Sequence, residues 1–339
     1  MIGFAMNRTR LALYTIVLAA TWFCLGRYWP SPQPEPARAS GRFDAITRAW
    51  PAHPAELEAF FRSVPRGEQD KALMALLASG RATAGSAVYN YFIFERYRSI
   101  WKEHRKGEPA VLLEIGPGYN LGQGFLFVLA GAGKYIGLDL FMSTSAHDLT
   151  TYQAAHDLLQ LAAPGSVRVK PEAVYSVKGR QVVFDPKRIE YLYPRESYDL
   201  GVPDGSIDYL YSNSVFEHVS DPDRTAVAIA KALSRGGLSA NHVDFRDHED
   251  FSKPLEFLKA DEASWRARFT GDKRPDYTNR KRLPDILAAF ENAGLRIVRV
   301  DSKRIPVSEE MRGAMHPDFR KFSLEDLGVT GAMIVVQKP

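Results

Sequence analysis

Short apolar runs separated by helical stretches are the feature of this sequence that most limits its fold. From residue 110 onward these runs alternate with segments whose apolar side chains recur at three- and four-residue spacing. Because buried strands that alternate with helices form parallel sheets, the pattern predicts an α/β fold with a mostly parallel sheet flanked by helices. We expect strands at 111–115, 135–140, 207–211, 238–243, 295–300 and 332–337. We expect helices between them at 121–130, 221–233 and 283–293.

The first thirty residues differ from the rest of the chain. Residues 11–26 carry no charge, and aromatic side chains that suit a membrane interface follow them. We therefore predict a membrane anchor or signal segment over 1–30 and a Pro-rich linker over 31–42. An anchor, in the form of a transmembrane helix, is favoured over a cleaved signal peptide. The reason is that the small-residue site at Ala37–Ala39 lies well past the apolar stretch.

Arginines on either side of this segment predict its orientation. More of them follow the segment than precede it, so the positive-inside rule places the folded body in the cytoplasm, anchored to the inner membrane. A misplaced start codon would instead make the protein cytoplasmic. Helical spacing then predicts N-terminal helices over 43–106, which pack on the core or form a lid, and a main domain over 107–339.

Composition excludes several other classes of protein. The 339 residues are 45% hydrophobic and 25% charged, which is the range of globular chains and not of disordered or collagen-like ones. The single cysteine cannot form an internal disulfide. A net charge of +4, spread without a basic block, gives no reason to expect a nucleic acid partner.

Glycines and an acid lie at the end of the first predicted strand. The segment VLLEIGPGYNLGQG places Glu114 within the strand and Gly116 and Gly118 directly after it. Glycines let the backbone approach a ligand closely, and the helix that follows offers its N-terminal N–H groups. Asp139 ends the second strand about twenty residues later, where a carboxylate can accept both hydroxyls of a ribose. An aspartate at this position can also cap a helix, so the glycine turn and Asp139 alone are common to many nucleotide folds.

Three further motifs complete a resemblance to a known family. They are PDGSID at Pro203–Asp208, EHV at Glu217–Val219 and LSRGGL at Leu233–Leu238. In this order, with the glycine turn and Asp139, the sequence resembles the class I S-adenosylmethionine-dependent methyltransferases. It is most similar to the methyltransferase type 11 group, which includes the ubiquinone-biosynthesis O-methyltransferases. The resemblance covers about 111–300 and implies a Rossmann-like sheet and S-adenosyl-L-methionine as the cofactor.

The resemblance also implies which residues bind the cofactor. They are Glu114, Gly116, Gly118, Asp139, Glu196, Ser197 and Asn213. The two glycines would lie under the methionine part, with Glu114 near its amino group, and Asp139 would bind the ribose. Glu196 and Ser197, found by counting back from PDGSID, would meet the adenine, and Asn213 would face the methionine and the acceptor. The chain departs from the family by a long insertion over roughly 144–195.

Two histidines are candidates for the proton acceptor. The sulfonium methyl is already electrophilic, so the protein has mainly to align a nucleophile and take its proton. His218 and His242 both follow or end strands at the carboxyl edge of the sheet, where parallel sheets bind ligands. An imidazole of ordinary pKa is a workable base. We predict His242 ahead of His218 as the catalytic base, with Asp244 as its partner.

Other roles for these side chains remain open. His218 could be structural, and His242 could cap a turn. His242, Asp244 and His248 could instead hold a divalent metal, but their spacing matches no definite motif, so the sequence assigns no metal. The basic segment 274–282 is expected to be a solvated face, with an anionic acceptor as the alternative.

These observations predict a membrane-anchored S-adenosylmethionine-dependent methyltransferase. The predicted acceptor is an oxygen of a glycan, a lipid-linked molecule or another small molecule. A non-catalytic binding protein with the same fold is one alternative. An NAD-dependent oxidoreductase is another, and it would share the glycine turn and Asp139 but not the EHV and Gly-Gly motifs.

Overall fold

The computed structural model describes residues 82–143, 146–270 and 276–339. The predicted membrane segment, the Pro-rich linker and the first part of the helical region lie outside these residues. In the described part of the chain, no helix has both the length and the apolar character needed to cross a membrane. The membrane anchor and the localisation therefore stay predictions.

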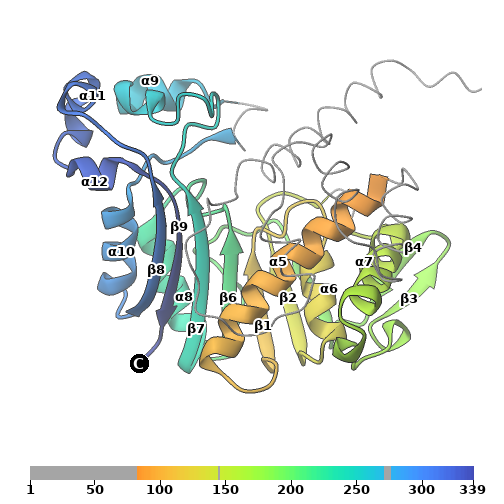
Figure 1. Ribbon diagram of the computed structural model, residues 1–339. Helices are drawn as coiled ribbons and strands as arrows, with labels where there is room; N and C mark the ends of the chain where they lie inside the picture. Colours follow the sequence, from red (N-terminus) through yellow and green to blue (C-terminus); the bar gives the residue numbers. More distant parts are fainter. Residues whose placement is uncertain (1–81, 144–145, 271–275) are drawn as a thin grey trace, which may run out of the picture.

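A seven-stranded sheet forms the centre of the fold, in the order β5-β2-β1-β6-β7-β9-β8 (Figure 1). β1 pairs in parallel with β2 and β6, β2 with β5, and β6 with β7, whereas β9 is antiparallel to both β7 and β8. The strands of the sheet are β1 (Val111–Ile115), β2 (Lys134–Leu138), β5 (Ile189–Leu192), β6 (Ile207–Asn213), β7 (Leu233–Asp244), β8 (Arg296–Arg304) and β9 (Val329–Gln337). The prediction of a mostly parallel, Rossmann-like sheet is confirmed.

Helices cover both faces of this sheet (Figure 1). One core cluster joins the sheet to α5, α6 and α7, and a second joins its other face to α8 and α10. These helices are α5 (Ala82–His104), α6 (Gly122–Leu129), α7 (Leu149–Ala162), α8 (Pro222–Ala232) and α10 (Leu283–Asn292). The predicted helices at 121–130, 221–233 and 283–293 correspond to α6, α8 and α10.

Helix α5 packs directly on the sheet. Phe94, Tyr97 and Trp101 lie in the same core cluster as the strands. The hydroxyl of Tyr97 donates a hydrogen bond of 2.7 Å to the carbonyl of Ser212 in β6, and Tyr209 donates one of 2.8 Å to the carbonyl of Tyr97. Of the two roles expected for this helical region, α5 has the packing role.

The predicted insertion over 144–195 contains the edge strand of the sheet. β5 pairs in parallel with β2 from within this range, and α7 precedes it. A separate hairpin, β3 (Tyr175–Lys178) with β4 (Gln181–Phe184), lies between them. The sequence analysis missed β5 because its four residues, IEYL, make no apolar run.

A smaller third core lies beyond β7 and β8. It joins the turn at Glu256–Lys259 to α9 (Glu262–Ala267) and to the segment with α11 (Glu309–Ala314) and α12 (Leu324–Leu327). Figure 1 shows α9, α11 and α12 together at one end of the sheet, above β7, β8 and β9. The loop after β6 reaches this small core, since Nδ1 of His218 lies 2.8 Å from the carbonyl of Tyr277, which packs against it.

Candidate functional site

The glycine turn after β1 lies beside the end of β2. Gly116 and Gly118 have φ angles of 74° and 73°, a conformation that favours glycine. A Cβ on Gly116 would lie 2.5 Å from Cγ2 of Val215, so a side chain does not fit there without a shift. The N–H of Gly118 points to Oδ2 of Asp139 at 3.4 Å. The two motifs that the sequence placed about twenty residues apart thus meet at one edge of the sheet.

This edge fits the cofactor that the resemblance implies. A Cβ on Gly118 would meet no atom within 4 Å, so the backbone is open to a ligand at that point. Burial raises the pKa of Asp139, and backbone N–H groups, including that of Phe141 at 3.1 Å, oppose the rise. Ribose hydroxyls that donate to this carboxylate would favour its charged form further.

Glu114 lies in a buried cluster of tyrosines beneath this edge. Its Oε2 accepts hydrogen bonds from the hydroxyls of Tyr135 at 2.6 Å and Tyr211 at 2.8 Å. The ring of Tyr97 stacks on that of Tyr211 with 4.6 Å between ring centres. Burial raises the pKa of Glu114 to about 7, against the effect of the two tyrosine hydrogen bonds. A contact of Glu114 with the cofactor amino group stays a prediction.

The two residues predicted to meet the adenine lie in the loop after β5. The N–H of Arg195 donates to the carbonyl of Asp139 at 2.9 Å, so this loop runs beside the predicted ribose acid. Glu196 follows directly. The hydroxyl of Ser197 is buried and shares a hydrogen bond of 2.7 Å with that of Thr225 in α8. The loop thus runs beside Asp139, and the Ser197 hydroxyl is bonded to α8; contact of Glu196 and Ser197 with the adenine stays a prediction.

Asn213, at the end of β6, is held by side chains from α5. Its Oδ1 lies 3.2 Å from the hydroxyl of Tyr97 and 3.4 Å from a guanidinium nitrogen of Arg96, and its Nδ2 donates to Tyr89 at 3.2 Å. The sequence analysis missed this contribution of α5. The helical spacing predicted the helix but gave no sign of which strand end it would reach.

His242 lies opposite Asn213, near the end of β7. Its Nδ1 is 3.3 Å from the hydroxyl oxygen of Ser214, and its carbonyl accepts the N–H of Ser214 at 2.9 Å. Burial, together with Arg96, lowers the pKa of His242 to about 3. The predicted partner, Asp244, accepts two hydrogen bonds from the Arg246 guanidinium, of 2.9 and 2.7 Å. Both oxygens of Asp244 are thus engaged by Arg246.

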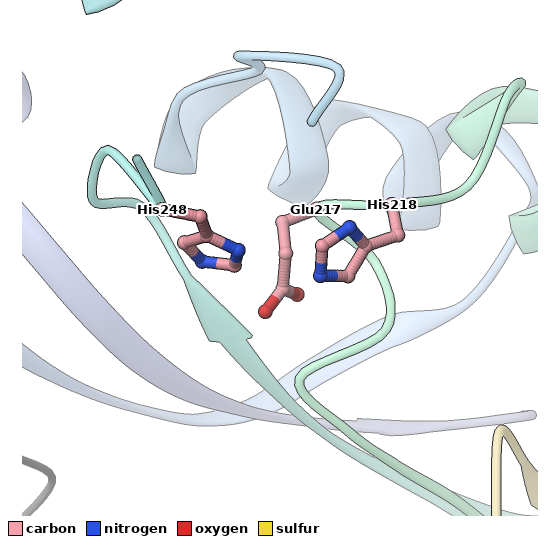
Figure 2. A group of neighbouring side chains, drawn as sticks. All are labelled: Glu217, His218 and His248. Carbon is pink, nitrogen blue, oxygen red and sulfur yellow. The ribbon is translucent and has the colours of Figure 1, made fainter. Parts of the chain in front are cut away.

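His218 belongs to a different group of side chains, with Glu217 and His248 (Figure 2). One possible ligand atom from each lies within 4.8 Å of the other two. Figure 2 shows the two imidazoles on either side of the Glu217 carboxylate. Burial, with His248 nearby, lowers the pKa of His218 to about 4, and burial raises that of Glu217 well above its ordinary value.

This group differs from the metal set that the sequence suggested. Of His242, Asp244 and His248, only His248 is part of it. Glu217 and His218 were visible in the EHV motif, but their proximity to His248 depends on the loops that follow β6 and β7.

Two arginines of the basic segment 274–282 are buried and not solvated. Arg280 donates to the carbonyls of Phe257 and Ala260 at 3.1 and 2.6 Å. Arg282 is 0% exposed and donates to the carbonyls of Phe245, Leu327 and Val329. The prediction of a solvated face is therefore wrong for both arginines, because their guanidinium groups donate hydrogen bonds to backbone carbonyls in distant parts of the chain.

Comparison with known proteins supports the predicted class. A family model described as a methyltransferase domain matches residues 170–240. This match confirms the resemblance to class I S-adenosylmethionine-dependent methyltransferases and supports S-adenosyl-L-methionine as the cofactor. Among the curated proteins compared, none matches the chain.

Several solved structures are similar to this chain at low sequence identity. A SAM-dependent methyltransferase from Methanosarcina mazei is 14% identical, with 70% of this chain and 96% of that chain covered and a TM-score of 0.40. One from Mesorhizobium loti is 15% identical, with 71% and 96% covered and a TM-score of 0.39. A phosphoethanolamine N-methyltransferase of Haemonchus contortus, in complex with S-adenosylhomocysteine, is 16% identical, with 72% and 53% covered and a TM-score of 0.39.

Proposed function

We propose that this protein transfers the methyl group of S-adenosylmethionine to an oxygen of a small-molecule, glycan or lipid-linked acceptor. The observation that carries the proposal is the meeting of the glycine turn after β1 with Asp139 at the end of β2. Gly116, Gly118 and Asp139 are the residues we assign to the cofactor, with Glu114, Glu196, Ser197 and Asn213 around them. The match of residues 170–240 to a methyltransferase domain supports the class of enzyme, but it does not include the glycine turn or Asp139.

The chain's own residues have two tasks in this proposal. When bound, the cofactor supplies an electrophilic methyl, whose transfer breaks its carbon–sulfur bond and leaves the proton of the acceptor hydroxyl to be taken up. His242 takes that proton at Nδ1, the nitrogen that lies 3.3 Å from the hydroxyl oxygen of Ser214. Its low pKa keeps the ring neutral at neutral pH, so Nδ1 has a lone pair that can accept the proton, but the same burial makes the ring a weaker base than an ordinary imidazole.

Transfer of a labelled methyl group tests the proposal. Full-length protein is incubated with methyl-labelled S-adenosylmethionine and separate protein-free extracts of polar metabolites, glycans and lipids. We expect label in one fraction, in a product whose methyl is bonded to oxygen. A methylated amine would correct the acceptor atom. No label in any fraction would favour the non-catalytic binding protein.

The N-terminal segment is a separate part of the proposal. We propose that residues 1–30 anchor the protein to the membrane, because their long uncharged stretch ends in aromatic residues. Full-length protein should then fractionate with membranes, and a chain that begins near Ser40 should not. Recovery of intact full-length protein wholly in the soluble fraction would contradict the anchor.

A further inference from the structure

The loops after β6 and β7 bring together three side chains that can bind a metal. Glu217 and His218 stand in the first loop and His248 in the second, and the two imidazole ring centres are 5.0 Å apart (Figure 2). Their possible ligand atoms all lie within 4.8 Å of one another. One carboxylate and two imidazoles are a ligand set that zinc and other divalent transition metals accept.

Glu217 and His248 have buried polar atoms that form no hydrogen bond with the described residues. Glu217 is 4% exposed, and neither of its carboxylate oxygens has a hydrogen-bond partner there. Nε2 of His248 is also buried without a hydrogen bond, 3.5 Å from Oδ2 of Asp244. Burying a carboxylate without a donor or cation is costly. A cation among these groups would remove that cost.

His218 is already oriented as a metal ligand would be. Its Nδ1 lies 2.8 Å from the carbonyl oxygen of Tyr277. Because a carbonyl only accepts, Nδ1 carries the proton of this hydrogen bond, and the lone pair of the neutral ring is on Nε2. Histidines that bind metals commonly donate from their other nitrogen to a carbonyl or carboxylate in this way.

We propose that Glu217, His218 and His248 bind one divalent transition metal ion of the zinc type. Tetrahedral ligands at about 2.0–2.2 Å from one ion lie about 3.3–3.6 Å apart, so side chains whose ligand atoms are now within 4.8 Å of one another must approach by up to about 1.5 Å to complete the site. Three protein ligands leave a coordination position open for an oxygen ligand. Val215, in the same loop as Glu217 and His218, lies against Gly116 of the glycine turn. The acceptor oxygen can take the open position, a role that depends on the proposed function, whereas binding of the ion does not.

Binding of metal ions alone to the full-length protein tests the proposal. After treatment with chelator and dialysis, titration calorimetry with Zn²⁺ should give one ion per chain, and Co²⁺ should produce visible d–d absorption. Glu217→Gln and His248→Asn should each weaken Zn²⁺ binding by more than about 100-fold, since even outer-shell changes cost about 10- to 100-fold. The matched control is His316→Asn, which alters an imidazole that lies 3.3 Å from Asp318, outside the cluster. It should bind as wild type does.

Two results would overturn the proposal: no binding by the wild-type protein, or equal affinity in the two cluster variants and the control. Because Glu217 is buried, the fold of each variant is checked by circular dichroism. If Glu217→Gln does not fold, the test depends on His248→Asn. The His248 side chain is 21% exposed, so its replacement should disturb the fold less. None of these readouts requires methyl transfer. Metal binding can therefore be absent while the cofactor still binds, and metal binding can be present while methyl transfer is absent. The two proposals are tested separately.

Discussion

The backbone N–H of Gly118 lies 3.4 Å from Oδ2 of Asp139, 21 residues further along the chain. The register of the sheet produces this proximity, because Ile115 at the end of β1 pairs with Leu138 at the end of β2. The segments that follow the two strands must then leave the sheet side by side. An open stretch of backbone and a carboxylate are thus held next to each other, as binding of a nucleoside requires.

Loss of the Asp139 carboxylate should weaken cofactor binding and leave the fold intact. A hydrogen bond to a charged group contributes roughly 1.5 to 3 kcal/mol, so Asp139→Ala should cost about tenfold or more in affinity for S-adenosylmethionine, measured by titration calorimetry. The matched control is Asp185→Ala. Asp185 is exposed and also accepts a backbone N–H from two residues on, that of Lys187 at 2.9 Å. Equal affinity in both variants would show that Asp139 is not the ribose acid.

Glu114 should make stability depend on pH near neutrality. Its folded-state pKa of about 7 lies above the ordinary 4.5, so the folded protein keeps the proton after the unfolded chain has lost it. The stabilisation is complete below about pH 4.5 and is lost as the pH rises through about 7, by roughly 3 kcal/mol in total. Glu114→Gln should reduce the decline in the free energy of unfolding by about this amount, measured with urea from about pH 5 to about pH 8; Glu217, whose pKa burial also raises, contributes to the decline that remains.

Glu190→Gln serves as the control for Glu114. Glu190 stands on β5 at the surface and pairs with Lys134 at 2.6 Å, so its removal should leave the decline in place. A decline of the same size in Glu114→Gln would mean that other groups cause it and that the pKa of Glu114 is not raised in the folded protein.

Much of the fold could be predicted from the sequence, for a physical reason. Strands buried on both faces are mostly apolar, so β1 and β2 stood out as runs such as VLLEI and YIGLDL. β5 did not, because an edge strand of four residues needs no such run. Because β5 was not recognised as a strand of the sheet, residues 144–195 were interpreted as an insertion.

The site was harder to predict because its contacts join distant segments. The glycine turn and Asp139 each follow a strand, and parallel pairing alone was enough to bring them together. The cluster of Glu217, His218 and His248 depends instead on two loops, whose shape no pattern in the sequence specifies. Charged residues are expected at the surface, so nothing in the sequence indicated that Arg282 is buried and donates hydrogen bonds to backbone carbonyls.

His242 should matter for turnover and not for cofactor binding. Loss of a general base typically lowers rate by about 10²- to 10⁴-fold, so His242→Asn should slow methyl transfer by that amount with the S-adenosylmethionine Kd close to wild type. The label-transfer assay measures the rate. His156→Asn, which alters a partly buried imidazole on α7, is the matched control and should be fully active. A fully active His242→Asn would show that the proton goes elsewhere.

Arg282 should be important for stability. Its guanidinium is fully buried and donates to three backbone carbonyls, from the end of β7, the end of α12 and the start of β9. Arg282→Met leaves those carbonyls without their donor and should lower the free energy of unfolding by roughly 3 to 5 kcal/mol. Arg235→Met, at an exposed arginine, should change it by less than about 0.5 kcal/mol. A loss below about 1 kcal/mol for Arg282→Met would contradict the structural role.

Binding of S-adenosylhomocysteine, compared with NADH, distinguishes a methyltransferase from an oxidoreductase. We expect one S-adenosylhomocysteine bound per chain in titration calorimetry, with binding weakened in Asp139→Ala and no heat from NADH. This result requires no knowledge of the acceptor. Binding of NADH with no response to S-adenosylhomocysteine would contradict the methyltransferase assignment and support an oxidoreductase.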